Sequence, residues 1–176
     1  MNKFQFCLIF IALCAGTAFG QKTLQSVYTG LGEKDCKAAK TEGDSYRGTC
    51  PGVGGYKLEL LEGDLRQTIN VIAPNGTKSE LDLWSVVSGG FSSVGQKAEW
   101  RVSGAGKTAK PQALIVRFNA SENPEDSTKI TSYLVVVKIS GNSACISEIV
   151  KPSADQNQKA RAAADAAGGK PCRASE

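Results

Sequence analysis

Carboxylates are the side chains of this sequence best suited to chemistry, and they recur in three groups along the chain. The groups are Glu62/Asp64, Glu80/Asp82 and Glu122/Glu125/Asp126. Paired carboxylates can hydrolyse glycosides, and a carboxylate-rich loop can bind calcium. The first two groups lie in or beside predicted turns, where solvated carboxylates are common. The third lacks the alternating Asp/Asn ligands of a calcium loop, so neither chemistry is the interpretation we favour.

The chain contains no histidine. This excludes Ser-His-Asp and Cys-His catalysis and any histidine metal site. Residues 103–108 resemble a phosphate-binding loop, but Arg101 stands where the first glycine is required. Residues 90–95 differ by one residue from a serine nucleophile elbow. We interpret both segments as loops and predict that the protein is not an enzyme, with no cofactor or metal assigned.

Four cysteines follow the first twenty residues, and an even number in an exported chain predicts two disulfides. Three pairings are compatible with the sequence. We favour Cys36–Cys50 and Cys145–Cys172, because each pair brackets one local segment. A zinc site is the alternative, but the chain offers neither a CxxC pair nor a histidine for it.

The first twenty residues have the pattern of a secretory signal peptide. Lys3 precedes an apolar run, and small residues at Ala18 and Gly20 offer a cleavage site. We therefore expect an exported protein, periplasmic or secreted, with residues 21–176 forming one domain. No later segment is apolar enough to span a membrane. Loss of Lys3 lowers the formal net charge from +4 to +3, and this mild charge argues against nucleic acid as a partner.

Short β-branched runs separated by turns predict an antiparallel sheet of about six strands. The period-two alternation is clearest in 56–61 and 65–72, which form a predicted hairpin through Gly63. Residues 21–45 are expected to be weakly structured. For residues 79–90 we favour a short helix capped by Ser79 over a strand. The remaining predicted strands are 45–50, 98–102, 113–118, 132–139 and 145–150.

Residues 154–167 are dominated by alanine and predict a C-terminal helix. Gly168 and Gly169 end it. Its small side chains would let it lie close against a sheet; they are Ala160, Ala163, Ala164 and Ala167. The predicted fold class is therefore α+β, with this helix packed on one face of the sheet and two disulfides.

Binding residues commonly lie in loops that a rigid sheet positions. The turn 51–55 and the polar loop 119–128 are the candidate binding segments of this chain. Aromatic side chains could also form a binding platform, but we assign at least four of six to the core; the six are Tyr46, Tyr56, Trp84, Phe91, Trp100 and Tyr133. The candidate binding residues are Gly52, Gly54, Gly55, Tyr56, Asn119, Glu122 and Asn123.

Three segments together resemble an uncharacterised family of small exported bacterial proteins. They are the Cys-Pro-Gly-Val-Gly-Gly-Tyr run at 50–56, the block 81–87 with its continuation at 98–101, and the segment 117–124. The resemblance covers nearly all of residues 21–176. It implies an envelope location and a four-cysteine framework, and it carries over no catalytic residue.

These observations favour a non-enzymatic binding module whose partner is an envelope or extracellular macromolecule. One such role is inhibition of a hydrolase, such as a protease or a lysozyme. The alternatives are a histidine-free, carboxylate-dependent glycoside hydrolase and a purely structural envelope protein. Two carboxylates about 5–10 Å apart in a deep cleft would favour the hydrolase, whereas protruding loops would favour the binding module.

Overall fold

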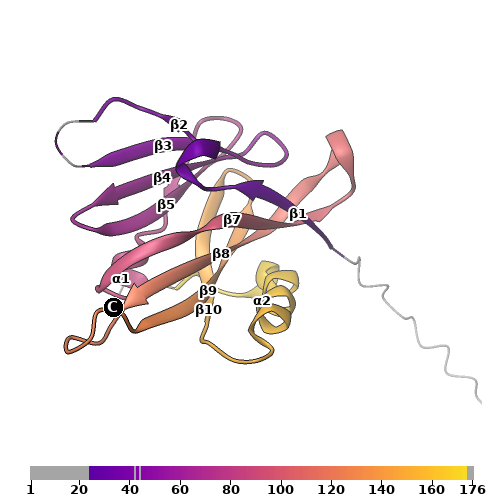
Figure 1. Ribbon diagram of the computed structural model, residues 1–176. Helices are drawn as coiled ribbons and strands as arrows, with labels where there is room; N and C mark the ends of the chain where they lie inside the picture. Colours follow the sequence, from indigo (N-terminus) through magenta and orange to yellow (C-terminus); the bar gives the residue numbers. More distant parts are fainter. Residues whose placement is uncertain (1–23, 42, 44, 174–176) are drawn as a thin grey trace, which may run out of the picture.

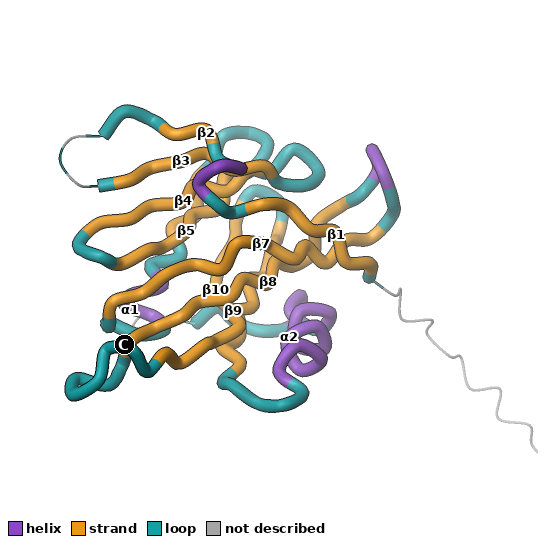
Figure 2. The backbone as a smooth tube through the Cα atoms, in the orientation of Figure 1, coloured by secondary structure: helices purple, strands orange, loops and turns teal. Residues whose placement is uncertain are grey.

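A computed structural model describes residues 24–41, 43 and 45–173, and the predicted signal peptide lies outside these ranges. Strands dominate the described residues, and only two segments are α-helical (Figures 1 and 2). The helices are α1 (Leu83–Val86) and α2 (Gln156–Asp165). The strands are β1 (Gln25–Gly30), β2 (Lys37–Ala38), β3 (Tyr46–Pro51), β4 (Lys57–Gly63), β5 (Arg66–Ile72), β6 (Lys78–Glu80), β7 (Phe91–Ser103), β8 (Lys110–Ser121), β9 (Ile130–Ser140) and β10 (Ser143–Val150).

The predicted α+β class with about six antiparallel strands is wrong. The described strands form one ten-stranded mixed sheet with the order β10-β9-β8-β7-β5-β4-β3-β2, while β1 pairs with β7 and β6 with β5. The pairing of β5 with β7 is parallel and runs through Arg66 and Ser92. Residues 21–45 were expected to be weakly structured, yet they contain β1, which pairs antiparallel with β7 through Val27 and Trp100. Helix is a minor component because most of the described residues belong to strands that pair with one another in this sheet.

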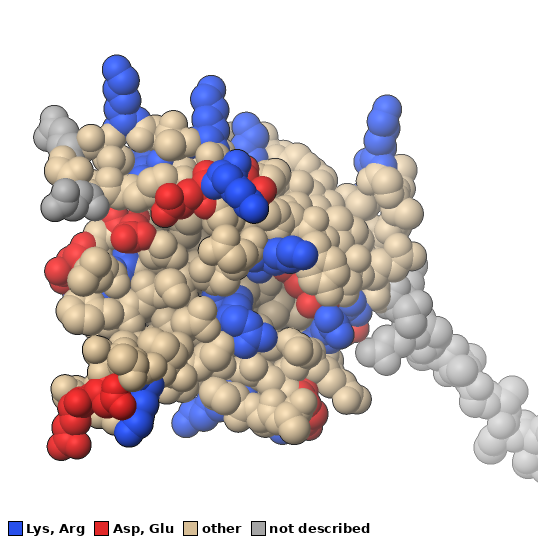
Figure 3. Space-filling view, viewed as in Figure 1, with Lys and Arg blue, Asp and Glu red and all other residues tan. Residues whose placement is uncertain are grey.

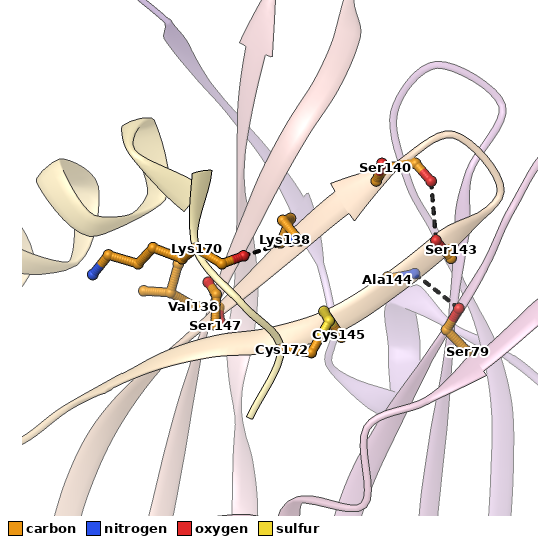
Figure 4. Close-up of a disulfide and its surroundings, with 10 residues drawn as sticks. All are labelled: Ser79, Val136, Lys138, Ser140, Ser143, Ala144, Cys145, Ser147, Lys170 and Cys172. Carbon is orange, nitrogen blue, oxygen red and sulfur yellow. Dashed lines mark hydrogen bonds between the residues drawn. A yellow bond between two sulfur atoms is a disulfide. The ribbon is translucent and has the colours of Figure 1, made fainter. Parts of the chain in front are cut away.

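The sheet folds over into two layers, with β2–β5 in one and β7–β10 in the other (Figure 1). Strand β6 pairs with β5 and extends the first layer. The edge strands of the two layers meet where the Ala144 amide of β10 donates a hydrogen bond of 2.9 Å to the Ser79 hydroxyl of β6 (Figure 4). The main core fills the space between the layers. Its side chains include Leu58, Leu60, Ile69, Val71, Trp100, Leu114, Val116, Phe118, Val135 and Val137.

Strands β8 and β9 are buried on both faces, which explains their nearly continuous apolar sequences. In β8, Leu114 and Val116 face the main core, while Ala113 and Ile115 face α2. The predicted C-terminal helix is confirmed, although α2 begins only at Gln156. Its predicted alanine face is confirmed as well, since Ala160, Ala164 and Ala167 are buried against the sheet and Ala163 packs beside them.

The helix predicted within residues 79–90 is correct for four residues only. Ser79 lies in β6 and caps nothing, since the helix starts at Leu83. The Leu83 amide instead donates to the Thr68 hydroxyl at 3.0 Å, so a side chain of β5 takes the place of a local cap. The preceding Asp82 has a positive φ of 45°.

Both favoured disulfides are present. Cys36–Cys50 ties the segment before β2 to β3, and Cys145–Cys172 ties β10 to the chain that follows α2 (Figure 4). Within the ranges that the structure describes, no helix has the length and apolar character needed to cross a membrane.

Candidate functional site

Three exposed apolar side chains gather at one end of the sheet, where the β4–β5 turn meets the start of β7 and the β8–β9 loop. Leu65 is 66% exposed, Phe91 49% and Ile130 55%. We call this region the hairpin-end surface and define it by Leu65, Arg66, Phe91, Glu122, Asn123 and Ile130. Large apolar side chains exposed together are uncommon on a protein surface unless they bind something.

The β4–β5 turn holds two non-glycine residues in the left-handed region, with φ of 51° at Asp64 and 57° at Leu65. A two-residue hairpin needs such angles, and asparagine or glycine normally supplies them. For a leucine the conformation costs about 1–2 kcal/mol. The turn therefore presents a branched apolar side chain to solvent from a backbone that disfavours it, and such local strain is concentrated at functional sites.

A groove of about 420 Å³ lies between the starts of β5 and β7 on one side and the β8–β9 loop on the other. Arg66, Gly90 and Phe91 line one side of it, and Glu122, Asn123 and Pro124 are among the residues that line it from the loop. A second hollow of about 310 Å³ adjoins it and is lined by Leu65, Phe91, Asn119 and Ile130, among others. Both are shallow and open to solvent.

Arg66 is held in place between the two walls. Its guanidinium carbon lies 5.3 Å from the centre of the Phe91 ring, a cation–π contact. Its Nε donates to the Gly89 carbonyl at 2.9 Å, and its Nη1 pairs with the Asp64 carboxylate. A fixed cation thus lies beside the exposed apolar side chains.

Glu122 is an ionised acceptor on the opposite wall. Burial alone would raise the pKa of Glu122, but hydrogen bonds from Thr131, Tyr133 and Ser88 hold it below its usual value. The Tyr133 hydroxyl donates to Glu122 Oε2 at 2.8 Å, and burial together with this carboxylate raises the pKa of Tyr133 to about 12. A carboxylate held in its ionised form suits an anionic contact better than a general acid.

The two candidate asparagines have local partners. Asn119 lies in β8, which runs three residues further than predicted, and its Oδ1 accepts a hydrogen bond from the Ser132 hydroxyl at 2.8 Å. Asn123 Oδ1 accepts from the Glu125 amide at 2.9 Å and so orders the β8–β9 loop. The loop is therefore shorter than the predicted range 119–128 and is held by its own hydrogen bonds.

The glycine turn lies at the opposite end of the sheet, about 35 Å away along β8. A Cβ atom on Gly52 would clash with the Tyr56 carbonyl oxygen, and Gly54 has a φ of 63° that favours glycine. The Tyr56 hydroxyl donates to the Gly141 carbonyl, and its ring centre lies 6.3 Å from that of Trp100. The structure thus separates Gly52, Gly54, Gly55 and Tyr56 from Asn119, Glu122 and Asn123.

The aromatic residues divide between the core and the candidate site. Trp100 is fully buried, and Tyr46, Tyr56 and Tyr133 pack against the main core from partly exposed positions. Phe91 instead lines the groove of the hairpin-end surface, and Trp84 lines a hollow beside Arg66. The sequence gives no direct signal for this division, since Phe91 begins a strand much as a core residue would.

A charged network that the sequence does not predict joins β1, β7 and α2. Arg101 is only 8% exposed and pairs with Asp165, while Glu99 on the same strand pairs with Arg161 at 2.7 Å. These partners lie more than sixty residues apart, so no local pattern reveals them. Each charge has an opposite charge beside it, which identifies the network as structural. The described ranges hold no group of three or more residues placed to ligate a metal.

No family model, curated protein or solved structure matches this chain significantly. Fold and surface therefore define the class: a predominantly β, disulfide-linked protein with an apolar, strained hairpin at one end of its sheet.

Proposed function

We propose that this protein is an exported, non-enzymatic binding module whose hairpin-end surface docks a protein partner. The observation that carries the proposal is the exposure of Leu65 on a strained turn. Its side chain is two-thirds exposed, and both central residues of the turn have positive φ. Neither folding nor solubility gains from a leucine there, because glycine would relieve the backbone and a polar residue would suit the solvent. Contact between Leu65 and a partner would offset both the backbone strain and the cost of exposing an apolar side chain to solvent.

The neighbours of Leu65 support a protein as the ligand. Phe91 and Ile130 extend the apolar area, and Arg66 with Glu122 places one cation and one anion beside it. Apolar and aromatic side chains with arginine, rimmed by polar groups, are typical of the centre of a protein interface. A small ligand is favoured less, because such ligands usually fill enclosed cavities rather than open grooves.

A hydrolase is the class of partner that we favour. A two-residue turn carrying one apolar side chain is narrow enough to enter an active-site cleft, and the paired strands behind it keep it rigid. Rigid segments bind tightly because little conformational entropy is lost on docking. The two disulfides are compatible with an oxidising location, and the signal-like residues 1–20 support export to the periplasm or the medium.

The test uses immobilised protein and envelope extracts of the producing organism. The double variant Leu65→Gly/Phe91→Ser removes the apolar contacts, and Tyr28→Ser removes a matched exposed ring (52%) outside this surface. We expect a partner that the wild type and Tyr28→Ser retain and the double variant loses, with a Kd about 100-fold weaker for the purified partner. Retention by all three baits would disprove this site.

The enzyme alternative has its own readout in the same preparation. Turnover of a glycan by the wild type that disappears in Glu122→Gln would replace the binding module with a carboxylate-dependent hydrolase. We expect no such turnover.

A further inference from the structure

A second surface lies on the solvent face of the strands β2 to β6. The register aligns one row of residues across all five strands: Lys37 pairs with Thr49, Thr49 with Glu59, Glu59 with Asn70 and Asn70 with Glu80. Residues directly opposite in antiparallel strands point to the same face. The alternate positions, such as Leu58, Leu60, Ile69 and Val71, face the main core. The row and its neighbours therefore form the outer face of this layer.

Four cations lie on this face, which we call the cationic face. They are Lys37, Arg47, Lys57 and Lys78, one from each of four strands, and all four are exposed. Each of the last three lies two residues from a member of the row and so shares its direction. Lys and Arg side chains project from the molecule over β2 and β3 at the top of Figure 3.

Glu59 occupies the centre of the cationic face, yet it is only 6% exposed. It accepts hydrogen bonds from Asn70 at 2.9 Å and from Lys78, whose Nζ lies 2.8 Å from Oε2, and Arg47 lies 3.9 Å from Oε1. The negative charge of Glu59 is therefore neutralised by Lys78 and Arg47. Lys37 and Lys57 have no ion pair among the described residues. Besides Glu59, the row of residues across β2 to β6 contains one acid, Glu80, which lies at the edge of the layer.

We propose that the cationic face binds a linear acidic polysaccharide through its carboxylate groups. Charge complementarity carries the proposal: cations outnumber acids, and two of the cations lack an internal partner. Strands about 4.8 Å apart place Lys37 and Lys78 about 19 Å from each other, so a chain with repeated charges can contact several cations at once. The Cys36–Cys50 disulfide holds the residue before Lys37 to β3 and so constrains the backbone from which this lysine projects.

The same face is poorly suited to single-stranded nucleic acid. Bases bind by stacking on aromatic side chains, and the row of residues across β2 to β6 contains none. The inference is independent of the hairpin-end surface, because the two share no residue.

The test measures binding of a fluorescently labelled mannuronate oligomer to the full chain by anisotropy. The neutral methyl ester of the oligomer and a single-stranded DNA of equal charge serve as comparison ligands. We expect the acid to bind, the ester not to bind, and the affinity to fall as salt rises, as for other polyanions.

Three variants locate the site. Lys37→Gln/Lys57→Gln should weaken binding about fivefold, whereas Glu80→Gln should strengthen it about twofold. Lys97→Gln/Lys107→Gln removes equal charge from exposed positions outside the face and should change the affinity less than about twofold. Circular dichroism and thermal melting check that each variant is folded.

Absence of binding to the acid, equal binding of acid and ester, or equal loss in the two lysine pairs would overturn the proposal. Tighter binding of the DNA would overturn it as well, since the ligand would then belong to another class. None of these results bears on the protein partner of the hairpin-end surface.

Discussion

Arg101 of β7 and Asp165 of α2 form a two-point ion pair, with Nε 2.7 Å from Oδ1 and Nη2 2.8 Å from Oδ2. The same guanidinium donates to the Ser26 hydroxyl and to the Leu24 carbonyl. One buried side chain thereby connects the first strand, the longest strand and the C-terminal helix. The pair matters because α2 offers the sheet little besides small alanine side chains.

Replacement of Asp165 by alanine should destabilise the protein by about 1–3 kcal/mol. The change leaves the Arg101 charge buried with weaker partners, which costs more than the ion pair itself contributes. Chemical denaturation measures the loss. Asp155→Ala breaks the exposed Asp155–Lys159 pair and is the control, from which a much smaller change is expected. Equal losses would show that Arg101 does not depend on Asp165.

Removal of the C-terminal disulfide as Cys145→Ser/Cys172→Ser should lower the free energy of unfolding by about 2–4 kcal/mol. The bond closes a loop with a sequence separation of 27, and it holds the segment in which the Arg173 amide donates to the Ile146 carbonyl at 2.7 Å. Hydrogen exchange should rise first in residues 167–173. Peptide mapping should still find Cys36 joined to Cys50, and an unchanged melting temperature would contradict the role given to this bond.

Leu65→Gly should raise stability by about 0.5–1 kcal/mol while it weakens partner binding. Glycine adopts the positive φ of this turn without steric cost, and the exposed leucine loses little burial. Gly76, which has a φ of 88° and open space where a Cβ atom would lie, provides the converse control. Gly76→Ala should destabilise by a similar amount, and thermal melting of both variants tests the argument. A destabilised Leu65→Gly would mean that the turn is not strained.

Glu59 should make stability depend on pH. Burial would raise the pKa of Glu59, but hydrogen bonds from Lys78 and Asn70 and the charges of Lys78 and Arg47 lower it below its ordinary value of 4.5. Because the folded pKa is below the unfolded one, the carboxylate stabilises the fold above pH 4.5, and this stabilisation is lost as the pH falls through the folded pKa. Glu59→Gln should therefore be less stable than the wild type at pH 7, and the difference should shrink below pH 4.5. A constant difference across this range would contradict the assignment.

The alanine face of α2 sets how closely the helix approaches the sheet. Ala164 is 2% exposed against β8 and β9, so Ala164→Leu should overpack this contact and cost about 1–3 kcal/mol. Ala162→Leu on the exposed side of the same helix should change stability by less than about 0.5 kcal/mol. Chemical denaturation of the two variants separates the cost of overpacking from the effect of leucine on helix propensity, because of these two positions only Ala164 is buried against the sheet.

The elements that could be predicted from sequence are those with local signals. The alternation on either side of Gly63 indicates the β4–β5 hairpin, and the alanine content indicates α2. The mixed ten-stranded sheet could not be inferred, because β1 pairs with a strand about seventy residues later and its sequence, Gln25–Gly30, alternates poorly. The short strands β2 and β6 owe their existence to pairing with neighbours rather than to their own residues.

The candidate site was predicted only in part, for a similar reason. Glu122 and Asn123 were identified from a polar loop and do line the groove, and Phe91 was among the six aromatic residues named for a possible binding platform. Leu65 and Ile130 were missed. One signal could have revealed Leu65. The residues between β4 and β5 are Asp64 and Leu65, and a two-residue hairpin turn with a leucine in it requires an unfavourable backbone. The exposure of Phe91 and Ile130 depends on tertiary packing, so no local sequence pattern predicts it.

The pairing of β1 with β7 also constrains the order in which the chain can fold. Strand β1 precedes the other strands along the chain, yet it has no sheet partner until residues 97–102 are available. The β3–β4–β5 meander and the nearby Cys36–Cys50 bond can form earlier, because the residues that they join are close in sequence. Contacts between distant segments form slowly. We therefore expect an early intermediate in which the meander is formed while the first strand is still unpaired and open to premature association, so chain termination before about residue 103 would yield an aggregation-prone product.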